Sequence, residues 1–122
     1  MFVGNSAGII RAFDLKTQKE MKPLMDEAHI NNSNRVTSLD ISLDGGFLIS
    51  GYKGGQIALW DLVNYKLIRL ITDLHNTEIL NAKIYYMDEG ESLYALSAED
   101  SGRVQFIKFS KKNFLGGYSS EA

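Results

Sequence analysis

The side chains that could carry chemistry in this chain are two histidines, several serines and scattered carboxylates. His29 and His75 are the only histidines, and cysteine is absent. A metal centre needs several ligands close together, and a general base needs a proton within reach. No carboxylate cluster shares the spacing of the two histidines, and the sequence contains no Gly-x-Ser-x-Gly segment. We therefore expect no enzyme activity, no catalytic residue, no metal and no cofactor, and structural roles for both histidines.

Two glycine-rich stretches resemble phosphate-binding loops only superficially. Residues 4–8 and 51–55 lack the Gly-Lys-Ser/Thr ending of such a loop, and no helical pattern follows either of them. Both are predicted to be hairpin turns between strands.

Composition restricts the class of protein. A chain of 122 residues with 44% hydrophobic content predicts one globular domain. No apolar run is long enough to span a membrane, and the N-terminus lacks the pattern of a signal peptide. The absence of cysteine is typical of a cytoplasmic protein. A net charge of −2 argues against a nucleic-acid surface, which would need a basic stripe.

The elements that must position these side chains are short strands separated by turns. Apolar and polar residues alternate from Val36 to Ile41, as in a half-buried strand. Glycine-containing turns follow at 44–46 and 53–55. Together with strands at 47–51, 56–61 and 66–72, the pattern predicts a four-stranded antiparallel meander.

The same unit recurs before and after this meander at equal intervals. The three copies share a glycine, an apolar residue two positions later, and a large apolar residue at the place of Trp60, which is Phe13 in the first copy and Ile107 in the third. A single sheet of this kind cannot bury both of its faces, so the copies are predicted to stack on one another.

The segment 55–61 with its Trp60-Asp61 pair, followed by a strand and by His75, resembles a WD repeat. The resemblance implies an all-β fold of antiparallel four-stranded blades in a WD-repeat β-propeller. The predicted strands make about two and a half blades, with strands of the first blade in 1–24, a complete blade in 36–72 and the next blade in 79–110. Residues 1–112 would form this partial propeller, and 113–122 a flexible tail. Because propellers close with about 4–8 blades, we expect a piece of a longer propeller.

Structural roles are implied for eight residues, which are Gly8, Phe13, Gly55, Trp60, Asp61, His75, Gly102 and Ile107. Trp60 is expected to fill the space between blades rather than to serve as a ligand platform. Many WD repeats hold a buried tetrad of a His, a Ser or Thr, a turn Asp and the Trp. The Asp place is taken here by Gly54, and by Ala7 and Ser101 in the flanking copies. We therefore expect the tetrad to be broken in every copy and the blades to depend on packing.

A closer resemblance lies in residues 51–62, the strand and loop of 66–75, and residues 100–104. Together they resemble the N-terminal propellers of the vacuolar protein sorting-associated protein 8 family over roughly residues 2–111. The resemblance implies a protein-interaction scaffold in a subunit of the CORVET tethering complex, acting in endosome-to-vacuole transport. Implied partners are tethering-complex subunits and, through a longer protein, an endosomal Rab GTPase. The location would be cytoplasmic, peripheral to endosomal or vacuolar membranes, with indirect membrane contact. Glu99 and the acidic insertion 88–91 depart from the family pattern.

One rim of the blades is predicted to carry the partner surface, because recognition residues sit on loops held by a rigid scaffold. The candidates on this rim are His29, Arg35, Tyr52, Lys53, His75 and Glu99. The alternative function is that of a generic WD-repeat adaptor, for example in ubiquitin-ligase substrate recruitment or cytoskeletal assembly. Bare sheet faces and unpaired edges further predict that the isolated chain self-associates.

Overall fold

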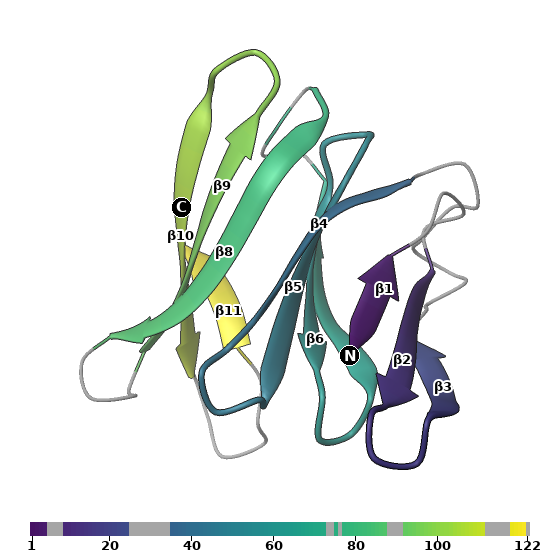
Figure 1. Ribbon diagram of the computed structural model, residues 1–122. Coiled ribbons are helices and arrows are strands. Elements are labelled where there is room, and N and C mark those ends of the chain that lie inside the picture. Colours follow the sequence, from purple (N-terminus) through teal and green to yellow (C-terminus); the bar gives the residue numbers. More distant parts are fainter. Residues whose placement is uncertain are drawn as a thin grey trace.

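The computed structural model describes residues 1–4, 9–24, 35–72, 75, 77–87, 92–111 and 118–121. Within these ranges the chain forms eleven β-strands in three antiparallel sheets (Figure 1). None of the described residues lies in a helix that is long and apolar enough to cross a membrane.

The three sheets are meanders whose strands follow one another along the chain. The first contains three strands, β1 (Phe2–Gly4), β2 (Ile10–Asp14) and β3 (Lys19–Leu24). The second contains four strands, β4 (Val36–Ile41), β5 (Phe47–Tyr52), β6 (Ile57–Asp61) and β7 (Lys66–Ile71). The third also contains four, β8 (Ile79–Met87), β9 (Ser92–Glu99), β10 (Val104–Lys111) and β11 (Tyr118–Glu121).

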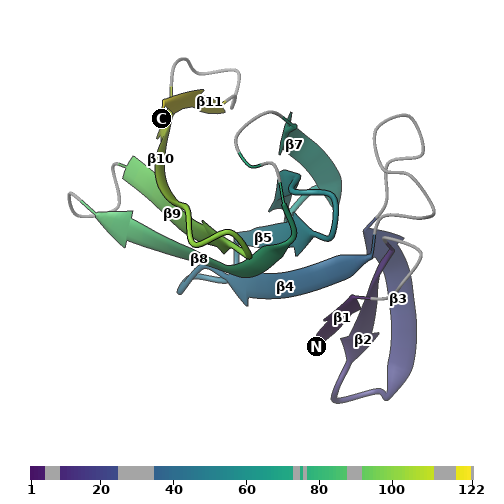
Figure 2. The ribbon, with the colours of Figure 1, turned by 90° about the horizontal axis from the view of Figure 1, so that it is seen from above.

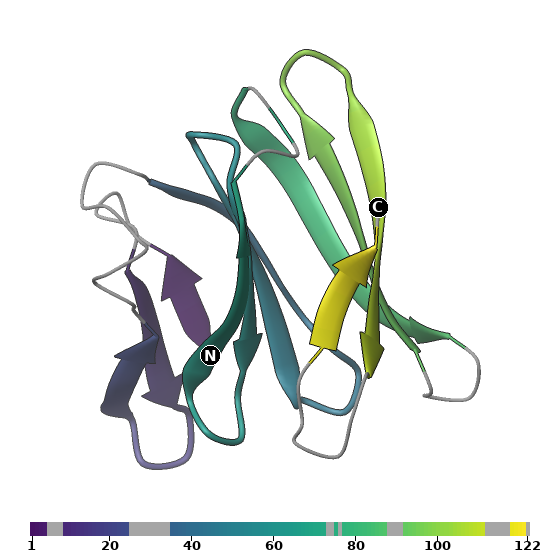
Figure 3. The same cartoon turned by 180° about the vertical axis from the view of Figure 1, so that it is seen from behind.

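Figure 2 shows the sheets side by side, with the second between the other two. The first strands of the second and third sheets, β4 and β8, are neighbours, and β1 approaches β4. Seen from behind in Figure 3, β7 and β11 lie on the opposite side of their sheets from β4 and β8. This arrangement is that of consecutive propeller blades, as the sequence predicts.

The ten predicted strands are all present, and an eleventh corrects the prediction for the C-terminal tail. Residues 118–121 pair with β10 in the register Lys108 to Glu121, so they supply the fourth strand of the third sheet. The tail was expected to be flexible because it is small and polar. An outermost strand, however, needs little apolar surface, since its backbone hydrogen bonds to β10 hold it in place.

The period-two alternation of the strands sends apolar side chains to both faces of the second sheet. Leu48, Ala58 and Trp60 face the first sheet and form one core with Ile10 and Leu24. The residues of the other parity, Ile49, Ile57 and Leu59, face the third sheet and form a second core with residues that include Ile84 and Ile107. Each core therefore lies between two sheets, and the second sheet belongs to both.

Glycine allows the sheets to approach at two equivalent places. A Cβ on Gly51 of β5 would lie 2.4 Å from Cγ2 of Ile79 at the start of β8. A Cβ on Gly4 of β1 would lie 2.4 Å from Cγ1 of Val36 at the start of β4. Real side chains do not tolerate such distances, so these glycines set the spacing between adjacent sheets.

The outer faces of the first and third sheets differ in chemistry. On the third sheet, Leu96, Val104 and Phe106 are exposed, and Phe106 contacts the rings of Tyr85 and Tyr94. On the first sheet, the exposed Arg11 makes a two-pronged contact with Glu20, at 2.6 and 2.8 Å, and lies over the ring of Phe13. The third sheet thus exposes several apolar side chains on its outer face, whereas an ion pair lies on the outer face of the first sheet.

Truncation of Trp60 tests the core between the first two sheets. Trp60 is fully buried, and its Nε1 donates a hydrogen bond of 2.9 Å to Oγ of Ser50. Trp60→Ala should lower the free energy of unfolding by about 3–5 kcal/mol, because it removes a large buried aromatic side chain. Trp60→Phe keeps most of the ring and should cost about 1–2 kcal/mol. An unchanged denaturation midpoint for Trp60→Ala would contradict this account of the core.

The exposed apolar face of the third sheet should make the 122-residue chain self-associate at micromolar concentration. Val104→Lys/Phe106→Lys places two charges on this face and should shift sedimentation towards the monomer. Leu43→Lys is the matched control, since Leu43 is 99% exposed in the β4–β5 turn and outside both cores. Wild-type chain that sediments as a monomer, or equal association of all three proteins, would rule out this face as the cause.

Candidate functional site

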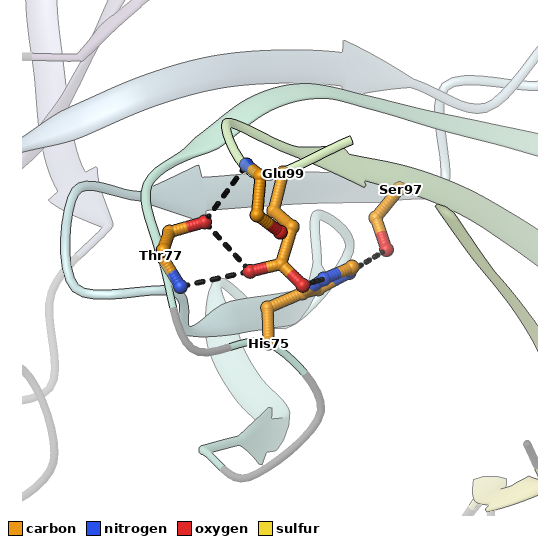
Figure 4. Close-up of polar contacts among 5 residues, drawn as sticks. His75, Thr77, Ser97 and Glu99 are labelled. Carbon is orange, nitrogen blue, oxygen red and sulfur yellow. Dashed lines mark hydrogen bonds and ion pairs between the residues drawn. The ribbon is translucent and has the colours of Figure 1, made fainter. Parts of the chain in front are cut away.

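The polar residues predicted to matter gather at one rim, where three connections meet. These are the β5–β6 turn, the segment before β8 and the β9–β10 turn (Figure 1). Beneath this rim, between the second and third sheets, lies a buried polar network of His75, Thr77, Ser97 and Glu99 (Figure 4).

His75 and Glu99 form the centre of this network and are almost fully buried, with exposures of 3% and 2%. Nδ1 of His75 lies 3.2 Å from Oε1 of Glu99, and Nε2 lies 2.6 Å from Oγ of Ser97. The Nδ1 contact is within ion-pair distance but outside the geometry of a regular hydrogen bond, so we regard it as mainly electrostatic. The imidazole is thereby fixed between a carboxylate and a hydroxyl.

Thr77 ties the segment before β8 to the same carboxylate. Its backbone N–H and its hydroxyl both donate to Oε2 of Glu99, at 2.8 and 2.7 Å. The N–H of Ser101 in the β9–β10 turn in turn donates to the Thr77 hydroxyl, at 3.3 Å. A buried carboxylate is costly unless it is compensated, and these donors supply the compensation.

The same segment also contacts the second sheet through the β5–β6 turn. Gly55 has a φ of +90°, and a Cβ at this position would lie 2.7 Å from the carbonyl oxygen of His75 and 3.0 Å from that of Thr77. Only glycine combines this dihedral angle with such a close approach. Glu99 and Gly55 therefore hold the segment from both sides and join two blades at the rim.

The tetrad of His, Ser or Thr, turn Asp and Trp is broken in the third blade, as predicted, but this network corrects the inference that the blade depends on packing alone. The turn position of the third sheet does hold Ser101 rather than Asp, but Glu99 supplies the carboxylate from the end of β9. A glutamate side chain is longer than that of aspartate. Glu99 therefore reaches His75 although it lies two residues before the turn position. Ile107 stands at the Trp place, is 1% exposed and ends the network with apolar packing. The rigidity of the third blade thus rests on polar contacts as well as on packing.

The second blade carries a different form of the same arrangement. Trp60 donates to Oγ of Ser50, and the Ser50 hydroxyl donates to the phenol oxygen of Tyr52 at 3.1 Å. Tyr52 is 1% exposed, and this burial raises the pKa of its phenol to about 12, against the lowering effect of the hydrogen bonds from Ser50 and Trp60. Tyr52 therefore stays neutral and fills the interior instead of contacting solvent.

Tyr52 and Glu99 occupy equivalent places in successive blades. Ser50 pairs with Ala58 in the second sheet, as Ser97 pairs with Gln105 in the third, and Tyr52 and Glu99 each follow two residues later. Period-two geometry places a residue two positions after a buried serine on the same face. This was the signal in the sequence for a buried Glu99, and the search for an Asp in the turn missed it.

The six predicted partner contacts fall into three groups. Tyr52, His75 and Glu99 are buried, so the prediction of a partner contact is wrong for them, because no partner surface can reach these side chains in the folded chain. Arg35 and Lys53 are exposed at the rim. His29 lies outside the described residues.

The residues with predicted structural roles are placed as follows. Asp61 ends β6 and accepts hydrogen bonds from Val63 N–H at 2.8 Å and from the backbone and side chain of Asn64. Partial burial would raise the pKa of Asp61, but these bonds and nearby Lys66 together lower it. Gly102 has a φ of +93° in the β9–β10 turn. Phe13 is half-buried on the outer face of the first sheet, and Gly8 lies outside the described residues.

The accessible part of the site is what we call the rim surface, formed by Arg35, Lys53, Glu78 and Asp100. Lys53 N–H donates to the Arg35 carbonyl, and Asp100 N–H donates to the Glu78 carbonyl, each at 2.9 Å. Nη2 of Arg35 lies 3.5 Å from Oε1 of Glu78. Two basic and two acidic residues from both blades are thus held by main-chain hydrogen bonds above the buried network.

The rim surface is accessible, whereas the pair beneath it is buried. Within the described ranges, no three His, Cys, Asp or Glu residues come together as a metal site. The His75–Glu99 pair is closed off from solvent, so a substrate could not reach it. The contacts of the pair join the segment before β8 to the end of β9.

Removal of the buried carboxylate tests this role. Glu99→Ala removes the acceptor of the Thr77 N–H and hydroxyl and the carboxylate beside the buried His75 ring, and should lower the free energy of unfolding by about 3 kcal/mol. Glu99→Gln keeps an acceptor oxygen and should cost less. The matched control is Glu20→Ala, which removes an exposed carboxylate paired with Arg11 and should leave the denaturation midpoint unchanged. Equal midpoints for Glu99→Ala and Glu20→Ala would contradict a stabilising role for the network.

Comparisons with known proteins agree with this architecture. The family described as the Vps8 beta-propeller matches residues 1–122, which is the whole chain. The human vacuolar protein sorting-associated protein 8 homolog is 32% identical over 84 residues, which cover 66% of this chain and 6% of the human protein. WD repeat-containing protein 18 of Bos taurus is 33% identical over 79 residues, which cover 59% of this chain and 18% of that protein.

Among solved structures, the β-propeller domain of Cps50 (Swd1) from Myceliophteria thermophila is similar, with a TM-score of 0.70 and 20% sequence identity. The match covers 98% of this chain and 34% of that chain. At this identity the likeness shows the fold alone, which is a partial propeller. The family match over the full length decides the relationship: the chain belongs to the Vps8 β-propeller family.

Proposed function

We propose that this chain is a protein-interaction scaffold of a vesicle-tethering subunit that acts in endosome-to-vacuole transport. The observation that carries the proposal is the family match over residues 1–122, together with the similarity to the human vacuolar protein sorting-associated protein 8 homolog. Propellers of this kind are generally non-catalytic scaffolds. On this proposal the protein works in the cytoplasm at the periphery of endosomal or vacuolar membranes, and its partners are other tethering-complex subunits.

The rim surface is the part of the described chain that we propose for partner contact. Its Arg35 side chain is 52% exposed and its Glu78 side chain 31% exposed, so both signs of charge are accessible. Exposed ion pairs contribute little to folding, and these residues are therefore available for recognition at little cost to the fold. Because the buried network fixes the backbone beneath them, a partner would meet a preformed surface.

Charge reversal at the rim tests the proposal. The variant Arg35→Glu/Lys53→Glu should reduce recovery of tethering-complex subunits with the tagged chain at least about fivefold, since it turns attraction into repulsion. Its melting temperature should stay close to that of the wild type, because both side chains are exposed. Quantitative mass spectrometry of the co-purified proteins measures the effect.

A matched control lies at the opposite rim. Lys16 in the β2–β3 turn and Lys66 at the start of β7 are exposed, so Lys16→Glu/Lys66→Glu makes the same change in net charge. Partner recovery should be unchanged in this control. If both double variants lose partners equally, net charge rather than the rim surface governs binding, and the proposed surface is wrong.

The competing function is that of a WD-repeat adaptor in another complex. The similarity to WD repeat-containing protein 18 over 59% of the chain supports this alternative. The same co-purification separates the two hypotheses. Recovery of tethering subunits supports the first, whereas recovery of cullin adaptors or cytoskeletal proteins without them supports the second.

A further inference from the structure

The most exposed large apolar side chains of the described residues lie at the tips of three turns. Leu43 is 99% exposed in the β4–β5 turn, Val63 is 81% exposed in the β6–β7 turn, and Leu15 is 69% exposed in the β2–β3 turn. No other large apolar side chain in the described ranges is more than 58% exposed. All three turns lie at one rim, opposite the rim surface (Figure 1). The β5–β6 and β9–β10 turns at the rim surface contain no large apolar residue, so such side chains gather at one rim only.

These apolar tips are held in place by carboxylates of their own turns. Asp14, Asp44 and Asp61 each accept a hydrogen bond from the backbone N–H two residues later, at 2.9, 2.9 and 2.8 Å. Bonds of this kind close a turn locally and need no contact with the rest of the chain. Each carboxylate is thus engaged with its own backbone, while the aliphatic side chain on the same turn stays exposed.

Three lysines accompany the apolar tips. Lys16 lies in the β2–β3 turn, Lys19 begins β3 and Lys66 begins β7, and all three are exposed. The long apolar stem of a lysine allows its ammonium group to reach a polar layer while the side chain beside it is buried. We call the three apolar tips, Leu15, Leu43 and Val63, together with these three lysines the turn-tip surface.

A lipid surface fits this arrangement better than a protein surface does. Three aliphatic side chains on separate turns of one rim can enter a bilayer interface together, because a fluid interface needs no matching pockets. A protein interface takes most of its affinity from aromatic and arginine anchors, and the turn-tip surface contains neither. The chain has a net charge of −2, so long-range attraction does not bring it to an anionic membrane. The apolar tips therefore provide the affinity, and the lysines provide a preference for anionic lipid.

We propose that the turn-tip surface is a membrane-contact site, at which Leu15, Leu43 and Val63 enter the interface of a bilayer that contains anionic lipid. The lysines bind the phosphate groups of the lipid headgroups. This contact is direct, whereas the family resemblance implies only an indirect one. The site lies opposite the rim surface, so the chain can bind a partner while it rests on a membrane, and either proposal can fail alone.

Single fluorescent probes locate the contact, because the chain contains no cysteine and each cysteine variant takes up one label. Leu43→Cys and Val63→Cys place the environment-sensitive fluorophore NBD at two tips. Ser101→Cys places it at the opposite rim, and Leu96→Cys on the outer face of the third sheet. Nanomolar protein is used to avoid self-association. Vesicles of phosphatidylcholine and phosphatidylserine should raise and blue-shift the emission at both tips and leave it unchanged at positions 96 and 101. No change at the tips, or an equal change at either control position, overturns the proposal.

Removal of the apolar tips tests their contribution to affinity. Leu43→Ser/Val63→Ser should weaken binding to the same vesicles in a flotation assay at least about tenfold, because two aliphatic side chains are no longer buried in the interface. The melting temperature should stay unchanged, since both residues are exposed. The matched control is Leu96→Ser/Val104→Ser, which removes the same pair of side chains from the third sheet and should leave vesicle binding unchanged. Equal loss in both variants would assign the binding to general hydrophobicity instead of the turn-tip surface.

Neutralisation of lysines tests the preference for anionic lipid. Lys16→Gln/Lys66→Gln should reduce binding to the vesicles that contain phosphatidylserine about tenfold, and leave the weaker binding to pure phosphatidylcholine vesicles unchanged. The matched control is Lys22→Gln/Lys83→Gln, which neutralises two exposed lysines on β3 and β8 and should keep the preference. The same loss in both variants would contradict a role for the lysines of the turn-tip surface.

A protein as occupant gives a different result. In that case Leu43→Ser/Val63→Ser lowers the recovery of a co-purified protein but leaves vesicle binding at the level of the wild type. This outcome assigns the apolar tips to a protein interface and overturns the membrane proposal.

Discussion

The second sheet of this chain has two apolar faces, and this constraint governs the rest of the structure. A sheet in water can leave one face solvated only if that face is polar, and the second sheet has Leu48 and Trp60 on one face and Ile57 and Leu59 on the other. Two neighbours are therefore required, and the first and third sheets supply them. The glycines at positions 4 and 51 allow the neighbouring strands to approach one another closely.

Apolar packing stacks the sheets but is not directional. Polar contacts therefore fix how neighbouring sheets are rotated and shifted relative to each other. Asp40 joins β4 to β8 through the Ile84 N–H, and Glu99 joins the segment before β8 to the end of β9. Both carboxylates accept from backbone N–H groups, whose positions follow the fold itself. The cost of placing a charge inside is offset by these donors, and the gain is a defined geometry at the blade junction.

This geometry bears on function through the rim. Arg35 and Lys53 are linked by a main-chain hydrogen bond, as are Glu78 and Asp100, and all four lie above the buried network. A scaffold protein recognises partners with surfaces that are formed before the partner arrives, because ordering a loop on binding reduces affinity. On the proposed function, the buried His75 and Glu99 contribute to recognition indirectly, by holding the segment that carries accessible residues.

The sequence by itself determined the strands, their order and the repeat, because period-two alternation and glycine turns are local properties that each segment carries alone. It also placed Trp60 in the core, since a large aromatic in an alternating strand faces a neighbouring sheet. Only the tertiary structure decided which polar residues are buried. Tyr52 and Glu99 look like surface residues at a turn, yet both are buried, and His75 and Thr77, which are distant in sequence, contact Glu99. The strand at 118–121 was decided in the same way, because its residues form a strand only where the edge of β10 offers backbone partners.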